Sequence, residues 1–196
     1  MAIVIFFTGH WFSSLFSQTF FLHRYSAHQM FKMNRFWERF FHIFTFISQG
    51  SSYLNARGYA ILHRLHHLHS DTSNDPHSPN HFKSVFGMMW RTKKVYSDLI
   101  NNRMKVKKNL LINIPNWHSL ESIADNWITR IAWGTFYVLF YILFTPSWWL
   151  FLLLPIHFLM GPIHGAIVNW CGHKYGYRNF KNIKDKSKNT LPFDFL

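Results

Sequence analysis

Acidic residues and cysteines are scarce in this sequence. Eight Asp and Glu stand against 21 Lys and Arg, and Cys171 is the single cysteine. One cysteine cannot form a disulfide within the chain, which excludes the class of small disulfide-stapled secreted domains and suits a protein that faces the cytosol. Sites for Mg²⁺ and Ca²⁺ are built from oxygen ligands, so the lack of a carboxylate cluster in the sequence argues against them.

The excess of positive charge predicts an anionic partner. Nucleic acid is a poor candidate, because no recognition motif occurs and the basic residues lie between hydrophobic segments. Anionic lipid headgroups fit better, since aromatic residues make up 20% of the chain and occur in blocks. The basic stretch 83–108 is also open to other uses: a membrane-surface binding module, or a contact for the phosphates of CoA or for an acidic electron carrier.

Three apolar runs are long enough to cross a membrane, a task that takes about 20 residues. They cover about 3–22, 127–144 and 148–170. A fourth run, about 36–56, is interrupted by polar and charged residues, which favours a helix lying in the membrane interface. The sequence therefore predicts an all-α fold, an integral membrane helical bundle.

The placement of charge predicts the topology of this bundle. The link between the second and third runs, residues 145–147, carries no charge, and all 21 Lys and Arg fall at or beyond the opposite ends of the runs. Cytoplasmic loops carry an excess of Lys and Arg. Residues 23–126 and 171–196 are therefore expected on the cytosolic side.

Fourteen histidines are present, and four of them fall within seven residues of the stretch HRLHHLHSD (63–71). On a helix, His63, His66 and His67 lean toward one face, but the adjacent His66 and His67 diverge by about 100°. Imidazoles that diverge in this way suit two neighbouring metal ions better than one. Imidazole suits Fe, Zn and Cu, so the ligands alone do not name the metal.

Two further groups lie where expected spans end on the cytosolic side. His23 and His28 are five residues apart, an interval that a regular helical face does not share. Either the helix ends or bends there, or the two histidines approach a metal from different sides. Asn169 and His173 are four apart and face the same way on a helix. We expect the three groups to converge in a cytosolic, histidine-rich cap that holds two metals.

The remaining histidines are expected to be ordinary polar partners or surface groups. His157 and His164 lie inside the third apolar run and are expected to form hydrogen bonds within the bundle. The others in this group are His10, His42, His69, His77, His81 and His118.

The order and spacing of these motifs resemble a known family over nearly the whole chain. HRYSAH (23–28), HRLHH (63–67) and NWCGH (169–173), together with DPHS (75–78) and GHKYGYRNF (172–180), resemble the membrane-bound fatty acid desaturases, in particular the acyl-CoA Δ9, stearoyl-CoA-like branch.

The resemblance implies a chemistry and a set of ligands. It implies two iron ions, O2 as co-substrate, and two electrons from an external donor, which together place a double bond in a saturated acyl chain. His23, His28, His63 and His67 would then hold mainly one iron. His66 and His173 would help to hold the other, with Asn169 acting through a bound water.

The sequence departs from the family pattern in two places. The family has a further HxxHH box, whereas no histidine follows His173 here, and it usually has another span before the first box. We therefore expect a single, shortened desaturase domain over 1–196, a fragment or a short form, which alone binds iron poorly and does not desaturate.

Two alternatives stay open from the sequence. A lipid hydroxylase of the same histidine-box superfamily would insert oxygen instead of forming a double bond, and a non-catalytic membrane remnant would bind metal without turnover. The acyl carrier is CoA, acyl-carrier protein or an intact lipid, and membrane lipids and a separate electron carrier are expected partners. The uncharged outer hairpin suits an integral protein of a bacterial inner membrane, with its site on the cytosolic side; a protein of the endoplasmic reticulum membrane is the alternative.

Overall fold

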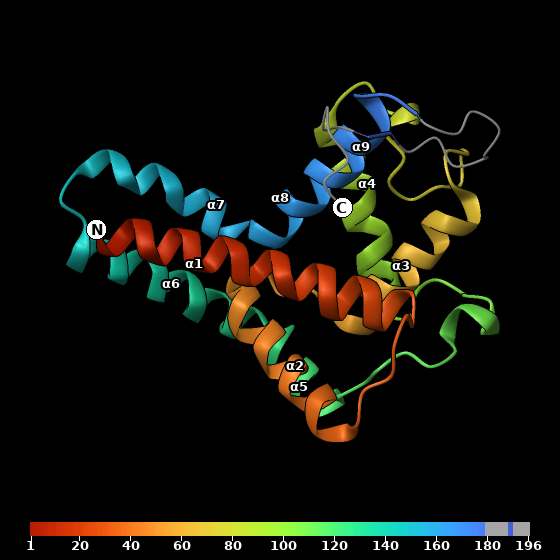
Figure 1. Cartoon of the computed structure of the whole chain (residues 1–196), viewed down its shortest axis with the longest axis horizontal. Coiled ribbons are helices and arrows are strands. Elements are labelled where there is room, and N and C mark those ends of the chain that lie inside the picture. Colours follow the sequence, from red (N-terminus) through yellow and green to blue (C-terminus); the bar gives the residue numbers. More distant parts are fainter. Residues whose placement is uncertain (179–187, 190–196) are drawn as a thin grey trace. The chain divides into compact units, whose positions relative to one another are not determined.

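The computed structural model of the 196-residue chain describes residues 1–178 and 188–189. The last two residues of GHKYGYRNF, Asn179 and Phe180, lie outside the described part, as do residues 190–196 at the end of the chain. The described residues are mainly helical (Figure 1), and their only β pairing is an isolated antiparallel bridge between Tyr177 and Asn189. Two compact units can be distinguished, Met1–Arg57 with Asn113–Ile163, and Gly58–Ile112 with His164–Leu196.

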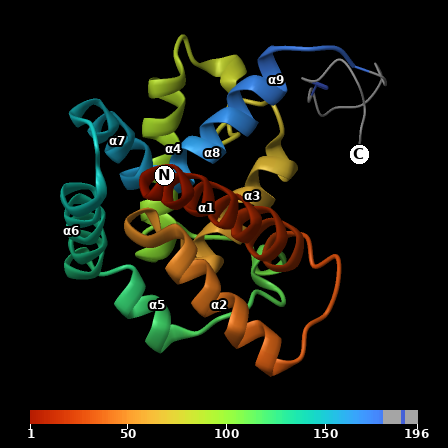
Figure 2. The same cartoon turned by 60° about the vertical axis from the view of Figure 1, so that its left-hand side comes forward.

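Unit 1 is a bundle of long helices. Its elements are α1 (Ala2–Phe16), η1 (Ser17–Ala27), α2 (Arg35–Gln49), η2 (Gly50–Ser52), α5 (His118–Ala124), α6 (Trp127–Phe144), η5 (Trp148–Leu153) and α7 (Leu154–Phe158). The helix α1 packs on α2, α6 and α7, and α1 and α2 lie side by side in both views (Figures 1 and 2). The apolar core joins α1 to the α6–α7 pair through Ile3, Tyr137, Tyr141, Leu150 and Leu154.

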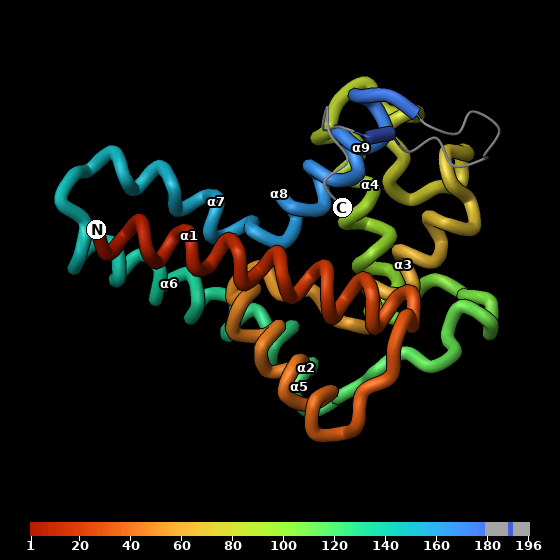
Figure 3. The backbone as a smooth tube through the Cα atoms, viewed as in Figure 1, coloured from red at the N-terminus to blue at the C-terminus, as the bar shows by residue number. Residues whose placement is uncertain are grey.

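In the first expected span, the helix in the structure extends beyond the apolar run of the sequence. The helix α1 runs without a break into η1, a π-helix (Figure 3), because the backbone continues in the helical region at Phe16 and Ser17. In the widened turns hydrogen bonds reach back five residues, as from His28 N to His23 O at 3.0 Å. The continuous helical segment therefore covers Ala2–Ala27 instead of about 3–22.

The third apolar run, expected as one span over 148–170, is bent by 72° between Trp148–Phe158 and Met160–Lys174. Pro162 explains the break, because proline lacks an N–H and its ring clashes with the carbonyl four residues earlier, at Phe158. Among the described residues one helix, α6, is long and apolar enough to cross a membrane by itself, and there are two such elements if the bent pair counts as one span.

The expected interfacial helix over about 36–56 is shorter in the structure. Asn34 caps α2 by accepting a hydrogen bond from Trp37 N at 3.0 Å, and the helix ends at Gln49. Gly50 follows with φ +49, a left-handed conformation that glycine adopts without strain. A β-carbon at Gly50 would also collide with the Tyr137 hydroxyl, so this glycine lets α2 end against α6.

Unit 2 carries the central histidine motif. Its elements are α3 (Ala56–His69, from Gly58 onward), η3 (Pro79–His81), α4 (Val85–Ile100), η4 (Lys108–Leu111), the end of α8 (Met160–Ala166), η6 (Ile167–Cys171) and α9 (Gly172–Lys174). Gly58 allows α3 to approach α4 closely, since a β-carbon there would crowd the side chains of Tyr96 and Ile100. Arg64 fixes the segment after α4 by donating to the carbonyls of Leu110 and Ile112, both at 2.9 Å.

Candidate metal centre

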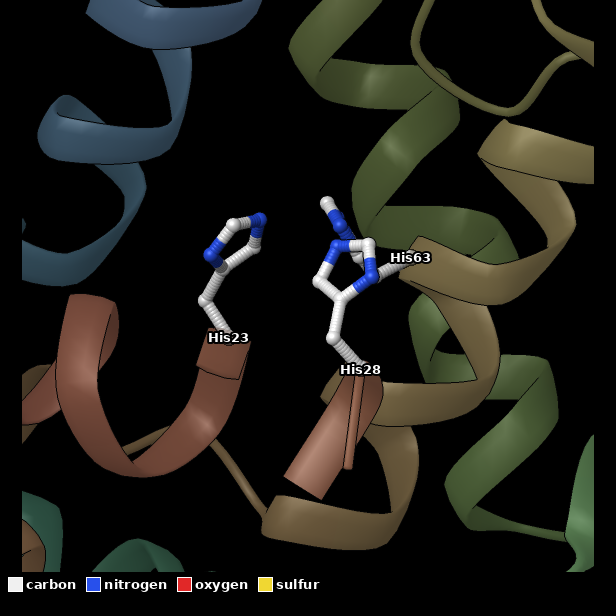
Figure 4. A group of neighbouring side chains, drawn as sticks. All are labelled: His23, His28 and His63. Carbon is white, nitrogen blue, oxygen red and sulfur yellow. The ribbon is translucent and has the colours of Figure 1, made fainter. Parts of the chain in front are cut away.

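In unit 1, the widened turn at the end of η1 brings two histidines together. His23 lies in the π-helix and His28 is its C-terminal cap residue. Their rings stand nearly perpendicular, with centroids 4.6 Å apart (Figure 4). An interval of five residues does not suit an α-helical face, but it is the repeat of π hydrogen bonding, and the helix also ends here. The expected end or bend is therefore present, and the π turn supplies its geometry.

In unit 2, α3 presents the first and last histidines of HRLHH as a pair. His63 Nε2 and His67 Nε2 lie 3.0 Å apart, and Tyr59 stacks on the His63 ring at 5.9 Å. Figure 4 also draws the His63 side chain on this helix. Ligand nitrogens at roughly 2.0–2.1 Å from a metal lie roughly 3 Å apart when they occupy neighbouring positions. This pair therefore has the spacing of two ligands of one ion.

His66 points to another part of unit 2, as predicted from its divergence of about 100° from His67 on the helix. Its ring is buried, and Nδ1 lies 2.9 and 2.8 Å from the two oxygens of Asp75. Burial alone would raise the pKa of Asp75, but the hydrogen bond and charge of His66, with backbone N–H donors of Asp71 and His77, lower it overall. Because Nδ1 of His66 donates to this carboxylate, Nε2 is the ring nitrogen left to face a metal.

His173 has a second aspartate behind it. Its Nδ1 lies 3.3 Å from Asp71 Oδ2, and its ring centroid is 5.3 Å from that of His66. Asp71 is fixed in turn, because its Oδ1 accepts hydrogen bonds from Ser78 and Asn80 at 2.7 and 2.6 Å. Asn169, the other residue expected here, lies in the π turn η6 and is half-buried.

Three residues around His66 and His173 were not predicted from the sequence. Asp71, Asp75 and His77 all lie in the turn 71–79, where no metal chemistry was expected. The His77 ring is buried 4.3 Å from that of His66, and neither of its nitrogens has a hydrogen-bond partner among the described residues. Burial, and then the charge of His66, lower the pKa of His77 to about 3, so the ring is neutral. Donor atoms of His66, Asp75 and His77 all lie within 4.8 Å of one another.

The remaining histidines are placed as follows. His157 forms hydrogen bonds within the bundle of unit 1, to His10 Nδ1 at 2.6 Å and to the Tyr141 hydroxyl at 2.9 Å. His81 Nε2 lies 3.0 Å from the backbone oxygen of Asp71, and His118 is exposed. His42 and His164 are buried.

The donor set fits a transition metal in both units. Imidazole nitrogens supply the donors, and the carboxylates of Asp71 and Asp75 already bind histidine Nδ1 atoms, which makes them orienting groups. Neutral imidazole suits Fe, Zn and Cu, whereas Mg²⁺ and Ca²⁺ prefer an all-oxygen shell. The two units thus define a helical protein with clusters of histidine that are suited to bind metal.

Comparison with known proteins identifies the family. Residues 1–195 match the model of the fatty acid desaturase family, and the chain belongs to that family. No curated protein matches, and no solved structure matches. Membership indicates a desaturase-type oxidoreductase function on fatty acids, in a family that is membrane-associated and typically di-iron, with a fatty acyl substrate and an electron carrier.

Proposed function

We propose that this protein is an O2-dependent fatty acyl desaturase with a di-iron centre, acting on an acyl-CoA in the manner of the Δ9 branch. One observation carries the proposal. The HRLHH motif separates into an outer pair, His63 and His67, and an inner member, His66, which has a carboxylate behind it. Helix packing alone does not require three imidazoles directed to two places, because each buried imidazole needs hydrogen-bond partners.

We assign the ligands by this division. His23, His28, His63 and His67 hold mainly one iron, and His66 and His173 help to hold the other, with Asn169 acting through water. Two imidazole pairs, His23 with His28 and His63 with His67, each within one unit, support the first assignment. Two aspartate-backed histidines support the second.

The residues of this chain orient the ligands and exclude water from them. When bound, the iron pair supplies, from O2 and two external electrons, an oxidant strong enough to remove hydrogen from an unactivated methylene. Asp75 and Asp71 accept hydrogen bonds from the Nδ1 atoms of His66 and His173, which leaves Nε2 of each ring as the nitrogen for a metal. Burial of His66, His77 and His173 keeps water from these rings.

The exposed basic residues of unit 2 support a phosphate-bearing carrier. Six of them lie within residues 93–108, on α4 and the segment after it: Lys93, Lys94, Arg103, Lys105, Lys107 and Lys108. They would contact the phosphates of CoA or an acidic electron donor, so binding of an acyl-CoA should weaken as salt rises. The same charge favours the cytosolic side of a bacterial inner membrane.

The test is metal content and product of the purified chain, reconstituted with iron, a reductant system and stearoyl-CoA. Two irons per chain and a new monounsaturated chain support the proposal, and would contradict the expectation from the sequence that this chain alone binds iron poorly and does not desaturate. A hydroxylated product would instead identify a hydroxylase. Metal binding without turnover, or no bound metal at all, would identify a non-catalytic remnant. His66→Gln should lose metal, whereas the exposed His118→Gln should retain it.

A further inference from the structure

A group of buried polar side chains lies inside unit 1, apart from the histidine clusters. On α2, His42, Thr45 and Gln49 follow one another at intervals of three and four residues, so they share one helical face. None of the three is more than 1% exposed. The opposite face of α2 is apolar and exposed, so this amphipathic helix turns its polar side inward.

The partner of this face is α1 with η1, which runs antiparallel to α2. Phe21 of η1 contacts the ring of His42, with centroids 4.8 Å apart, and Phe16 of α1 contacts Phe44 at 5.9 Å. Residues earlier in α1 therefore lie level with residues later in α2. Ser14, two residues before Phe16, is placed level with Thr45, and its side chain is completely buried.

Polar atoms of all four residues have no hydrogen-bond partner among the described residues. They are Ser14 Oγ, both ring nitrogens of His42, Thr45 Oγ1 and Gln49 Nε2. The other end of the Gln49 amide is used, since Oε1 accepts from Leu54 N at 2.8 Å, which fixes the amide group. We call these four residues the polar seam.

Leaving such groups unsatisfied costs about 1–3 kcal/mol each. Serine and threonine usually avoid this in a helix by bonding to their own backbone, as Thr8 does to Val4 O at 2.8 Å. The hydroxyls of the polar seam do not. His42 has lost the option of charging, because burial, and then the nearby Arg39 charge, lower its pKa to about 4. A neutral imidazole has one donor and one acceptor nitrogen.

We propose that the polar seam is a second binding site of unit 1, which takes one or more oxygen atoms able both to donate and to accept hydrogen bonds. Two sources share this chemistry: ordered water, and a hydroxyl carried on a lipid chain. The amide of Gln49 donates, His42 donates through one nitrogen and accepts through the other, and the hydroxyls of Ser14 and Thr45 do either. A plain alkyl chain satisfies none of these groups.

The first test is the thermal midpoint of the full chain in detergent for Thr45→Val, which removes the hydroxyl at nearly constant shape. If a ligand oxygen bonds to Thr45, the midpoint should fall by roughly 2–5 °C. The matched control is Thr8→Val, because Thr8 is an exposed threonine on α1 whose hydroxyl bonds to carbonyls of its own helix. It should change the midpoint by less than about 1 °C. A higher thermal midpoint for Thr45→Val would mean that no oxygen ligand bonds to Thr45 in the polar seam, and would overturn the proposal.

A double variant tests whether the two helices share the ligand. Ser14→Ala combined with Thr45→Val should lower the midpoint by less than the sum of the single changes, because the second change removes a bond to an oxygen already displaced. Strict additivity would contradict a shared site.

The source is identified by two further measurements. Transfer of magnetisation from water to the ¹⁵N-labelled His42 ring, assigned through its loss in His42→Phe, indicates ordered water. Greater thermal stabilisation by 12-hydroxystearate than by stearate, lost in Thr45→Val, indicates a chain hydroxyl. Absence of both signals would refute the site.

Discussion

His66 and His173 each turn Nδ1 toward an aspartate, and this pairing decides which of their nitrogens can bind a metal. Asp75 is the more heavily used of the two acceptors. It takes hydrogen bonds from His66 and from the backbone N–H groups of Asp71 and His77, at 2.8–3.0 Å. An amide in its place keeps one acceptor oxygen and turns two N–H donors toward groups that are themselves donors.

Asp75→Asn should therefore lower the affinity of the purified chain for iron by about 10–100-fold, measured by competition with a chelator of known affinity. The expected cause is loss of the tautomer that presents His66 Nε2. Asp98→Asn is the matched control, since Asp98 pairs with Arg103 at the surface. Equal affinities of the wild-type chain and Asp75→Asn would show that this carboxylate does not orient a ligand.

Glu121 makes folding depend on pH. Burial raises its pKa from about 4.5 to about 7, helped by the charge of Asp125 and opposed by a hydrogen bond from Asn55 and by Arg57. A carboxyl whose pKa is raised in the folded state binds its proton more tightly there than in the unfolded chain. Stability from this group is thus complete below about pH 4.5, falls as pH rises toward about 7, and is constant above that.

The thermal midpoint should consequently fall between pH 5 and pH 7.5 more steeply for the wild-type chain than for Glu121→Gln. All other titratable groups are the same in both proteins, so the difference between the two curves isolates Glu121. Parallel curves would show that Glu121 is not held protonated by the fold.

At the scale of elements, α2 is an amphipathic helix whose polar face is buried and whose apolar face is exposed. Its exposed stripe of Phe36, Phe40, Ile43 and Ile47 repeats at intervals of four, three and four residues, opposite the buried polar seam. An exposed apolar stripe of this kind on a basic protein is suited to lipid. The stripe supports the interfacial position that the sequence predicts for this helix.

One guanidinium ties the start of α6 to η2, the short element that follows α2. Arg130 donates to Ser51 O and Tyr53 O, both at 2.9 Å, and to Asp125 at 3.1 Å. Arg130→Lys replaces a planar fork with a point charge and cannot keep all three bonds. We expect a loss of about 1–3 kcal/mol, seen as a fall in thermal midpoint of several degrees.

The control for this change is Arg103→Lys, because Arg103 also pairs with an aspartate but is exposed, and surface pairs are worth about 0–1 kcal/mol. Similar midpoints for Arg130→Lys and Arg103→Lys would mean that Arg130 does not anchor α6.

Element positions could be predicted from the sequence where hydrophobicity decides them, and not where local backbone chemistry does. The apolar run 127–144 corresponds residue for residue to α6, Trp127–Phe144. The 72° bend in the third run could have been anticipated from Pro162, but the apolar pattern continues through it. The π turns at His28 and Asn169 leave no mark in hydropathy.

At the scale of the whole molecule, the histidine motifs pointed to the right family because their spacing survives in the sequence. The orienting carboxylates did not emerge from the sequence, because DTSNDPHSP has the composition of any turn. Only the fold of unit 2 brings Asp71 to His173, 102 residues later along the chain. Contacts of such long separation depend on tertiary packing, which periodicity does not record.

Membrane topology follows from the charge of the entire chain and can be tested directly. Because residues 145–147 carry no charge and the segment 101–108 is strongly basic, Pro146 is predicted outside the cell and Asn109 in the cytosol. In a Cys171→Ser background expressed in a bacterial membrane, Pro146→Cys should react with a membrane-impermeant maleimide in intact cells. Asn109→Cys, exposed in η4, should react only after lysis. The background variant alone measures unspecific labelling. Reaction of Asn109→Cys in intact cells would reverse the topology and place the histidine-bearing segments outside, away from cytosolic acyl-CoA and reductant.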